Sequence, residues 1–469
     1  MAKGLPESVE GLRCIADWAA ELKPAGIPKD VRRRAVMVLV DDVTAMIAAR
    51  DEPEVVSIYE YSRRRAKLAE ATLLDGGMSR VDRERAAFAN AVAANWCELD
   101  EGYRVVGCHG GLYSVPAAIA EAESAGLAVE DLLRAIVIGY EVSARFARTF
   151  QLPARPRTVH PHSTFAAIGA AASVAALRGS SAAHFFNVLT TAATFTTVGP
   201  YTHVVNGALV QNAWAGMGAM AGFRANELAA CGLTGLPGSP YEVFAEILGA
   251  TPFLDELSQR LGEAWAIRDG YHKVHACCSY THATVDAILD VRERIPAGAM
   301  TDKIAEIVVE THDLALNLDA IEPQTTLAAR FSLPHIVATT LAHGHAGPEA
   351  FRGATLEDVN IGSMREKVRL RRYEPTMPPP NDRPARVSIF LSGGNTVVSE
   401  CLSARGGPDR PWTEAAVLDK VARLTGEAYP AFPGMARRLL VADRKSLGRP
   451  WSDVLIELLG NEARGRCLV

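Results

Sequence analysis

The feature of this sequence that most constrains its fold is the helical spacing of apolar side chains from residue 8 to about residue 262. In "PKDVRRRAVMVLVDDVTAMIAA", for example, apolar residues recur every three or four positions, and Pro28 stands where a helix can begin. Many of these segments are rich in Ala, Gly and Ser, which lets neighbouring helix axes approach closely. The first half of the chain therefore predicts an all-helical domain.

The pattern changes after about residue 300. "KIAEIVVETHD" alternates between apolar and polar residues, and "ARVSIFLSGGNTVVSECLS" predicts two strands joined by a hairpin at Gly393-Gly394-Asn395. The tail returns to helical patterns in "TEAAVLDKVARLTG", with Thr413 as a cap, and in "WSDVLIELLG". We therefore predict a mostly α fold, with a large all-helical domain (1–272 and 406–469) and a smaller α+β lid domain (273–405) inserted before the C-terminal helices.

Composition and charge narrow the class of protein. The 469 residues carry a net charge of -5 with interspersed signs, which argues against a nucleic-acid partner. The N-terminal segment has acidic residues where a signal peptide needs an apolar centre, and no apolar run is long enough to span a membrane. The eight cysteines include no C-x-x-C pair, which disfavours a disulfide framework or a cysteine zinc site. We expect a cytoplasmic protein without a membrane partner.

A first group of polar side chains lies in "ELDEGYRVVGCHGG", residues 98–111. It offers three carboxylates, among them Asp100, followed by Tyr103, Arg104 and His109. Adjacent carboxylates raise one another's pKa, and histidine exchanges protons near neutral pH. The group is either part of an acid/base site or a solvated helix end.

A second group is His160-Pro161-His162, which precedes a helix predicted to begin near Ser163 or Thr164. A helix N-terminus favours negative charge, so a histidine there can hold a carboxylate or donate a proton. The alternative is structural, with His162 capping the helix and His160 a buried, hydrogen-bonded imidazole.

A third group lies in "YHKVHACCSYTHATVDA", residues 271–287, at the predicted domain junction. Lys273 and His282 can act as acid, base or carboxylate clamp, or the segment can be a polar junction without chemistry. Cys277, Cys278 and His282 are conceivable metal ligands, but vicinal cysteines fit a tetrahedral site poorly. The sequence also lacks G-x-S-x-G, P-loop and G-x-G-x-x-G motifs, which leaves metal-free acid/base chemistry.

Together these segments resemble the MmgE/PrpD superfamily, which includes 2-methylcitrate dehydratases, cis-aconitate decarboxylases and iminodisuccinate epimerases. The matching motifs are "LDE" at 99–101, "HGG" at 109–111 followed by "SVPAAIA", "GYE" at 139–141, "HPHSTFAAIG" at 160–169, Lys273 with His282 before "TVDA", and "FSLPHIVA" at 331–338. They occur in the family's order along nearly the whole chain. The resemblance implies a helical domain with a lid, a cleft between them, a homodimer, and no metal or organic cofactor.

The resemblance also implies which residues form the site. The catalytic residues would be Asp100, His109, His160, Lys273 and His282, and the substrate-binding residues Tyr103, Arg104, Tyr140, His162 and Gln211. In this assignment Asp100 orients a histidine, His160 and His282 transfer protons or hold a carboxylate, and Lys273 is a clamp or an acid. The small residues after His162 would let that helix sit deep in the domain.

The sequence departs from the family where dehydratases and decarboxylases carry a lysine and a histidine, because "QNAWAG" places Gln211 and Trp214 there. We therefore expect a cofactor-independent lyase acting on a small carboxylate, with a dicarboxylate better supported than a tricarboxylate. One alternative is an epimerase or isomerase that uses Lys273 with Tyr140, or a histidine pair, as opposed bases. Another is a carboxylate-binding protein without catalytic activity.

Overall fold

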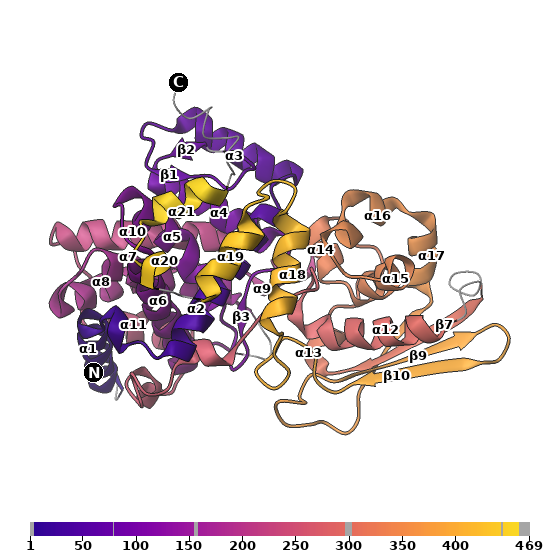
Figure 1. The fold of residues 1–469 in the computed structure, drawn as a ribbon. Coiled ribbons are helices and arrows are strands. Elements are labelled where there is room, and N and C mark those ends of the chain that lie inside the picture. Colours follow the sequence, from indigo (N-terminus) through magenta and orange to yellow (C-terminus); the bar gives the residue numbers. More distant parts are fainter. Residues whose placement is uncertain (1–3, 78, 154–157, 296–302, 442–443, 459–469) are drawn as a thin grey trace.

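The computed structural model describes residues 4–77, 79–153, 158–295, 303–441 and 444–458. These residues form a helical lobe and a smaller lobe that contains the main sheet (Figure 1). The longer helices of the first lobe are α1 (Leu5–Glu21), α2 (Lys29–Ala48), α3 (Pro53–Arg65), α4 (Arg83–Trp96), α5 (Gly110–Ser124), α6 (Val129–Thr149), α7 (Pro161–Leu177), α8 (Ala182–Thr194) and α10 (Trp214–Ala230). The predicted mostly α fold is confirmed.

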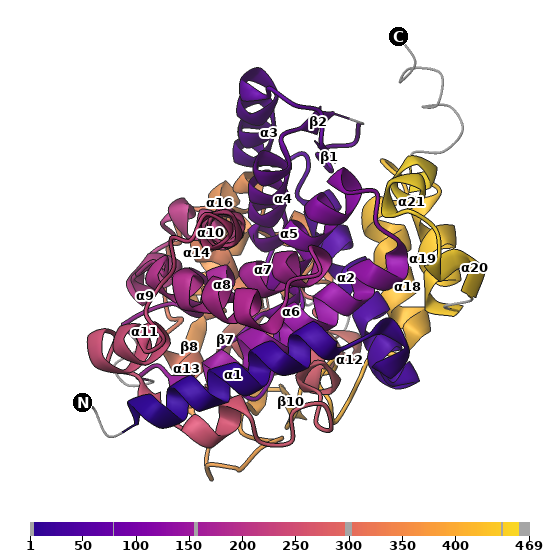
Figure 2. The ribbon, with the colours of Figure 1, turned by 90° about the vertical axis from the view of Figure 1, so that its left-hand side faces the viewer.

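Helix α7 is packed against α5, α6, α8 and α10, and it lies in the middle of the helical lobe in Figure 2. Its small residues permit close contacts: a Cβ added at Gly218 of α10 would lie 2.4 Å from the Cβ of Ala166, and one added at Gly222 would lie 2.6 Å from that of Ala170. The Ala- and Gly-rich sequence therefore serves close helix packing, as the sequence predicts.

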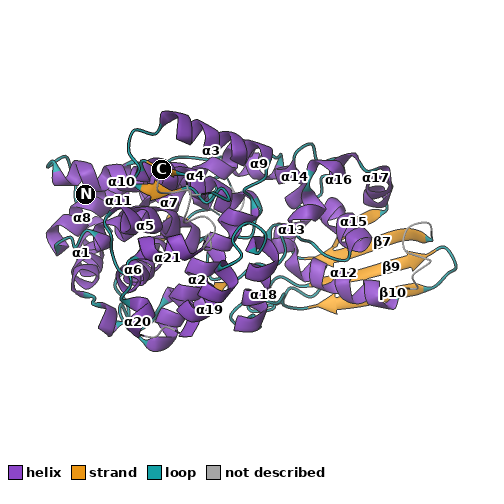
Figure 3. Ribbon diagram, turned by 45° about the horizontal axis from the view of Figure 1, so that its top comes forward, coloured by secondary structure: helices purple, strands orange, loops and turns teal. Residues whose placement is uncertain are grey.

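The second lobe contains a four-stranded sheet of order β10-β9-β7-β8. The predicted hairpin joins β9 (Ala385–Leu391) to β10 (Thr396–Cys401), and β9 is antiparallel to β7 (Ile304–Thr311). Strand β8 (Val368–Arg372), which pairs in parallel with β7, was not expected from the sequence. Helices α12 (His282–Arg294), α15 (Leu333–His343) and α17 (Val359–Glu366) contribute to the core of this lobe, and Figure 3 shows helices over one face of the sheet.

The C-terminal helices return to the first lobe. Helices α18 (Glu414–Thr425) and α19 (Phe432–Val441) pack against α2, α20 (Arg444–Leu447) against α6, and α21 (Trp451–Leu458) against α5. Thr413 caps α18 by accepting a hydrogen bond from the Ala416 amide, as predicted. The exact domain boundaries at 272/273 and 405/406 stay a prediction. Across the described residues, no helix has the length and apolar character needed to cross a membrane.

Candidate active site

A short strand pair brings the first and third polar groups together. Strand β3 (Gly102–Tyr103) pairs with β6 (Gly270–Tyr271) in antiparallel register, with Gly102 opposite Tyr271, so Asp100 and Lys273 both lie just beyond the same end of one small ladder. The pair needs glycine at 102, because a Cβ there would lie 2.5 Å from the Tyr271 ring. This local packing fixes residues that are more than 170 positions apart in the sequence.

Lys273 is the centre of a buried ion cluster. Its Nζ donates to Asp100 Oδ1 at 3.1 Å and to Glu98 Oε2 at 3.2 Å. Burial alone would lower the pKa of Lys273, but the negative charges of Asp100 and Glu98 raise it well above its ordinary value. Burial would likewise raise the pKa of Asp100, but the positive charge of Lys273 lowers it to about 2. Lys273 is therefore a fixed cation and a poor base.

His109 is held in a defined orientation by Asp100. It stands at the N-terminal boundary of α5, and its Nδ1 lies 2.5 Å from Asp100 Oδ2. Because an ionised carboxylate only accepts hydrogen bonds, Nδ1 carries the proton and Nε2 is the ring atom that can take another. The side chain remains 18% exposed, so this nitrogen can reach a ligand.

His160 and His162 have different roles at the start of α7. The helix begins at Pro161, earlier than predicted, and His160 rather than His162 is its cap: His160 Nδ1 accepts from the His162 amide at 3.3 Å. His160 Nδ1 is thus an acceptor and its Nε2 carries hydrogen in the neutral ring. The His162 ring lies between those of His109 and His160, with centroids 4.6 and 4.4 Å away.

His162 is a buried, neutral side chain. Its Nδ1 lies 2.9 Å from the Tyr113 hydroxyl. Burial, and then the neighbouring positive charges of His160 and His109, lower its pKa well below the ordinary value. His162 therefore separates the other two imidazoles and does not compete with them for protons.

These groups line one cleft. The lining residues are Glu98, Gly107, His109, His160, Pro161, His162, Tyr201, Lys273, Cys278, Ser279, Tyr280 and Phe331. Three of the five predicted catalytic residues thus face the same space, and Asp100 supports two of them from behind. The part of the lining that comes from the lid side of the predicted boundary is Lys273, Cys278, Ser279, Tyr280 and Phe331.

His282 and Arg104 line a neighbouring pocket instead, which shares Ser279 with the cleft. His282 Nε2 donates to the Cys277 carbonyl at 3.0 Å, so Nδ1 holds the lone pair of the neutral ring. Burial lowers the pKa of His282 to about 3, with the nearby His275 adding to the effect. His282 is therefore neutral at pH 7 and can accept a hydrogen bond.

Tyr103, Tyr140 and Gln211 do not line either pocket. The Tyr103 hydroxyl accepts from Arg148 at 3.2 Å, and Tyr140 donates to Glu101 Oε1 at 2.5 Å. Gln211 is fully buried, and its side-chain oxygen lies 3.3 Å from the Asn95 amide nitrogen. In this structure none of these three predicted substrate-binding residues lines the cleft or the neighbouring pocket.

Glu98 is a site residue that the sequence analysis did not select. It lines the cleft, and its backbone φ of +53° lies in the left-handed region, which is uncommon for a residue other than glycine. Its carboxylate is ion-paired with Lys273. The sequence showed Glu98 only as one of three neighbouring carboxylates, and it carried no sign that Tyr113 would pair with His162.

One group in this site has the composition of a metal site. A carboxylate oxygen of Asp100 and ring nitrogens of His109 and His162 all lie within 4.8 Å of one another. Asp100 already accepts from Lys273 and His109, and His162 is paired with Tyr113. A metal ion would have to displace these bonds and would stand beside the Lys273 ammonium, so the donor set fits hydrogen bonding better than metal ligation.

The arrangement combines a base and a cation beside one space. His109 Nε2 can remove a proton, Asp100 stabilises the imidazolium that results, and Lys273 can stabilise negative charge that develops on a substrate oxygen. His160 adds a hydrogen-bond donor at Nε2. These groups suit proton transfer next to a carboxylate.

Comparison with known proteins identifies the family. Residues 13–249 match the MmgE/PrpD N-terminal domain, and residues 275–444 match the MmgE/PrpD C-terminal domain. The chain is also 24% identical over 443 residues to a cis-aconitate decarboxylase-like protein, oryM, of Aspergillus oryzae, with 87% of this chain and 89% of that protein covered. Both halves of the family pattern are therefore present in order, and this chain belongs to the MmgE/PrpD family.

Proposed function

We propose that this protein is a cofactor-independent lyase, a dehydratase or decarboxylase, that acts on a small di- or tricarboxylate by acid/base chemistry next to a carboxylate. The observation that carries the proposal is the Asp100–His109 pair beside the buried Lys273 cation at one cleft. A base with a fixed tautomer and a cation that stays charged are the two groups such a reaction needs.

The steps follow from the protonation states of these groups. In a dehydration, His109 Nε2 takes the proton next to the carboxylate, the C–H electron pair forms the new double bond, and the His109 imidazolium gives its proton to the departing hydroxyl, which leaves as water and regenerates the neutral base. In a decarboxylation, His109 starts as the imidazolium; the C–C electron pair stays on the conjugated substrate as CO2 departs, and His109 Nε2 delivers its proton to carbon, to be replaced from solvent. In both, Lys273 stabilises the carboxylate oxygens on which charge accumulates.

The name of the Aspergillus oryzae relative favours decarboxylation within this class, but its 24% identity supports only the type of enzyme. Gln211 and Trp214 replace the lysine and histidine expected of the tricarboxylate enzymes, so one cationic wall is missing. A dicarboxylate is therefore the better candidate. Assembly as a homodimer and a cytoplasmic location stay predictions of the family resemblance.

An epimerase is the second candidate, and the positions of the His109 and His160 imidazoles favour it. They flank His162 on both sides and could address opposite faces of one carbon. The pair Lys273 and Tyr140 supports epimerisation less well, because Lys273 is held as a cation and Tyr140 is fully buried with its hydroxyl on Glu101.

Proton NMR in D2O with chelator-treated protein and a panel of small di- and tricarboxylates tests the proposal. A new alkene signal or loss of CO2 supports the lyase, whereas exchange of a single α-proton with an intact skeleton replaces it with the epimerase. Binding without either change would favour a non-catalytic protein. His109→Gln should abolish turnover, and His343→Gln, at the exposed end of α15, should leave it unchanged.

A further inference from the structure

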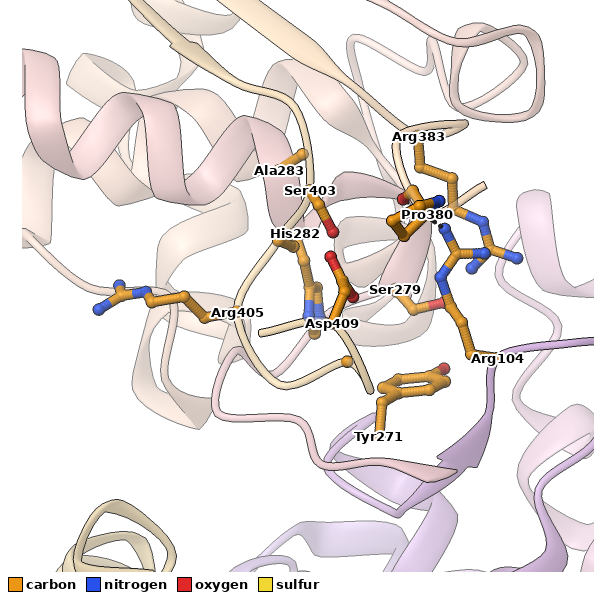
Figure 4. A pocket seen from close by; sticks show the side chains of 12 residues that line it. Arg104, Tyr271, Ser279, His282, Ala283, Pro380, Arg383, Ser403, Arg405 and Asp409 are labelled. Carbon is orange, nitrogen blue, oxygen red and sulfur yellow. Dashed lines mark hydrogen bonds between the residues drawn. The ribbon is translucent and has the colours of Figure 1, made fainter. Parts of the chain in front are cut away.

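The pocket next to the catalytic cleft is lined by polar side chains from both lobes (Figure 4). Tyr271 and Ser279 contribute hydroxyl groups, and Arg104, Arg383 and Arg405 contribute guanidinium groups. Ser279 lines both this pocket and the cleft, so the two spaces adjoin. A ligand that occupies the cleft can therefore extend a second group into this pocket.

Two of the three arginines are already neutralised by carboxylates. Arg104 forms an ion pair with Asp382 at 2.6 Å, and Arg405 forms one with Asp286 at 3.1 Å. Arg405 also points away from the other two in Figure 4. Neither side chain therefore supplies an uncompensated positive charge to the pocket.

Arg383 differs from both. Within the described residues its guanidinium makes no hydrogen bond, its buried Nε lacks a partner, and its nearest carboxylate oxygen, on Asp382, is 3.9 Å away. The guanidinium carbon lies 4.8 Å from the centre of the Tyr280 ring, and Tyr280 also lines the cleft. A largely desolvated arginine with unused donors is suited to a bidentate contact with a carboxylate.

The remaining charged group of the lining is Asp409, whose side chain is solvent-exposed. Because water screens this exposed carboxylate, Asp409 offsets the charge of Arg383 only weakly. His282, which also lines the pocket, donates its Nε2 proton to Cys277 and brings no charge at neutral pH. The pocket therefore has a net attraction for anions.

We propose that Arg383 binds a second carboxylate of the substrate, which makes this pocket the specificity subsite of the enzyme. The assignment rests on the proposed function, because it places the reacting carbon at His109 and Lys273 and the distant carboxylate at Arg383. Tyr271 and Ser279 are the additional donors within the subsite. The substrate class is then a dicarboxylate whose two acid groups bridge the cleft and the pocket.

Arg104 is a positioning residue in this arrangement. Its Nη2 donates to Asp382 Oδ1 and lies 3.4 Å from the Pro380 carbonyl, so it ties the loop that carries Arg383 to the helical lobe. Figure 4 shows the Arg104 and Arg383 side chains approaching the same corner from opposite sides of the pocket. Loss of Arg104 should therefore weaken binding through the loop, with a smaller effect than loss of Arg383.

Calorimetric titration of the full-length protein with maleate and with its monoamide, maleamate, tests the subsite without requiring turnover. We expect wild type to prefer maleate, and Arg383→Gln to weaken maleate binding roughly 10- to 100-fold, the usual cost of losing a charge-assisted hydrogen-bond donor, while maleamate binding changes little. Arg405→Gln is the matched control from the same lining and should change maleate affinity less than about threefold. Arg383→Lys should restore part of the affinity.

The outcomes separate the subsite from the reaction. Equal loss of maleate binding in the Arg383→Gln and Arg405→Gln variants, or no preference of wild type for maleate over maleamate, would overturn the subsite. If maleate binding depends on Arg383 but no carboxylate in the NMR panel is turned over, the proposed lyase activity fails and the subsite stands. Where turnover occurs, Arg383→Gln should raise KM for the dicarboxylate and leave kcat within a few fold.

Discussion

Replacing Asp100 with asparagine should remove most of the activity while leaving a folded protein. The carboxylate lies 2.5 Å from His109 Nδ1, and it stabilises the imidazolium that forms when His109 takes a proton. With charge centres about 4 Å apart and an effective dielectric constant of about 20, this interaction is worth about 4 kcal/mol, which corresponds to roughly a 10³-fold fall in kcat. Asparagine also permits the wrong tautomer of His109, which acts in the same direction.

Glu98→Gln is the matched control for this substitution. Glu98 is the other carboxylate on Lys273, and among the described residues His109 is hydrogen-bonded to Asp100 and not to Glu98, so each variant removes one of the two ion pairs of Lys273. Both should therefore lower the free energy of unfolding by about 2 to 3 kcal/mol, less than the cost of leaving a buried charge with no partner. Only Asp100→Asn should lose the imidazolium stabilisation, so Glu98→Gln should lower kcat less than about tenfold.

Steady-state kinetics on the substrate found by NMR, with urea unfolding of the same preparations, distinguishes these effects. A kcat for Asp100→Asn within tenfold of wild type would refute the role of Asp100 in supporting His109. Equal falls in kcat for the two variants would instead show that the charge on Lys273 governs the rate and that His109 needs no partner.

Three further predictions concern pH, packing and metals. Burial raises the pKa of Glu101 from 4.5 to about 8. Between these two pH values the folded chain keeps the proton on Glu101 and the unfolded chain releases it. The free energy of unfolding should therefore fall as the pH rises from about 4.5 to 8. The loss of stability between these pH values is at most about 4 kcal/mol at pH 8, and Glu101→Gln should remove it. If the variant and the wild type had identical urea midpoints at pH 5 and at pH 8, this role of Glu101 would be contradicted. Gly218→Ala should lower the free energy of unfolding by about 1 to 3 kcal/mol because its Cβ would meet Ala166. Gly393→Ala, in the open hairpin turn, should cost little. Thermal unfolding that ranks the two variants the other way would disprove the packing argument. Dialysis against EDTA should leave kcat unchanged because Lys273 already supplies the cation beside Asp100, and a loss that one divalent metal restores would overturn this.

Periodicity was enough to predict the helical lobe, the hairpin and the return of the C-terminal helices, because each depends on a pattern within one segment. Strand β8 was missed because "VRLRR" is short and charged, and it is a strand only through its parallel pairing with β7. The start of α7 was placed too late because His160 accepts the His162 amide itself, a capping contact that histidine makes less often than Ser, Thr, Asp or Asn.

The site was predictable only in part, because some of its residues are brought together by contacts between distant segments of the chain. The family motifs selected Asp100, His109, His160 and Lys273, which meet in the structure. Contacts between distant segments leave no local pattern, and Arg383 follows a proline-rich loop that has no helical or strand periodicity. Fully buried residues such as Tyr140 can share a motif with a site and still act only on its walls.

The charges of the cleft explain why a second cation is needed for a dicarboxylate. Glu98 and Asp100 bring two negative charges to Lys273, which brings one positive charge, so the cluster has an excess of negative charge before any substrate binds. This excess repels a doubly charged substrate. Binding energy for the second carboxylate must then come from a cation outside the cluster. Arg383, with its unused donors in the adjoining pocket, supplies that charge without neutralising Asp100, so the orientation of His109 and the affinity for the second carboxylate are set by separate groups.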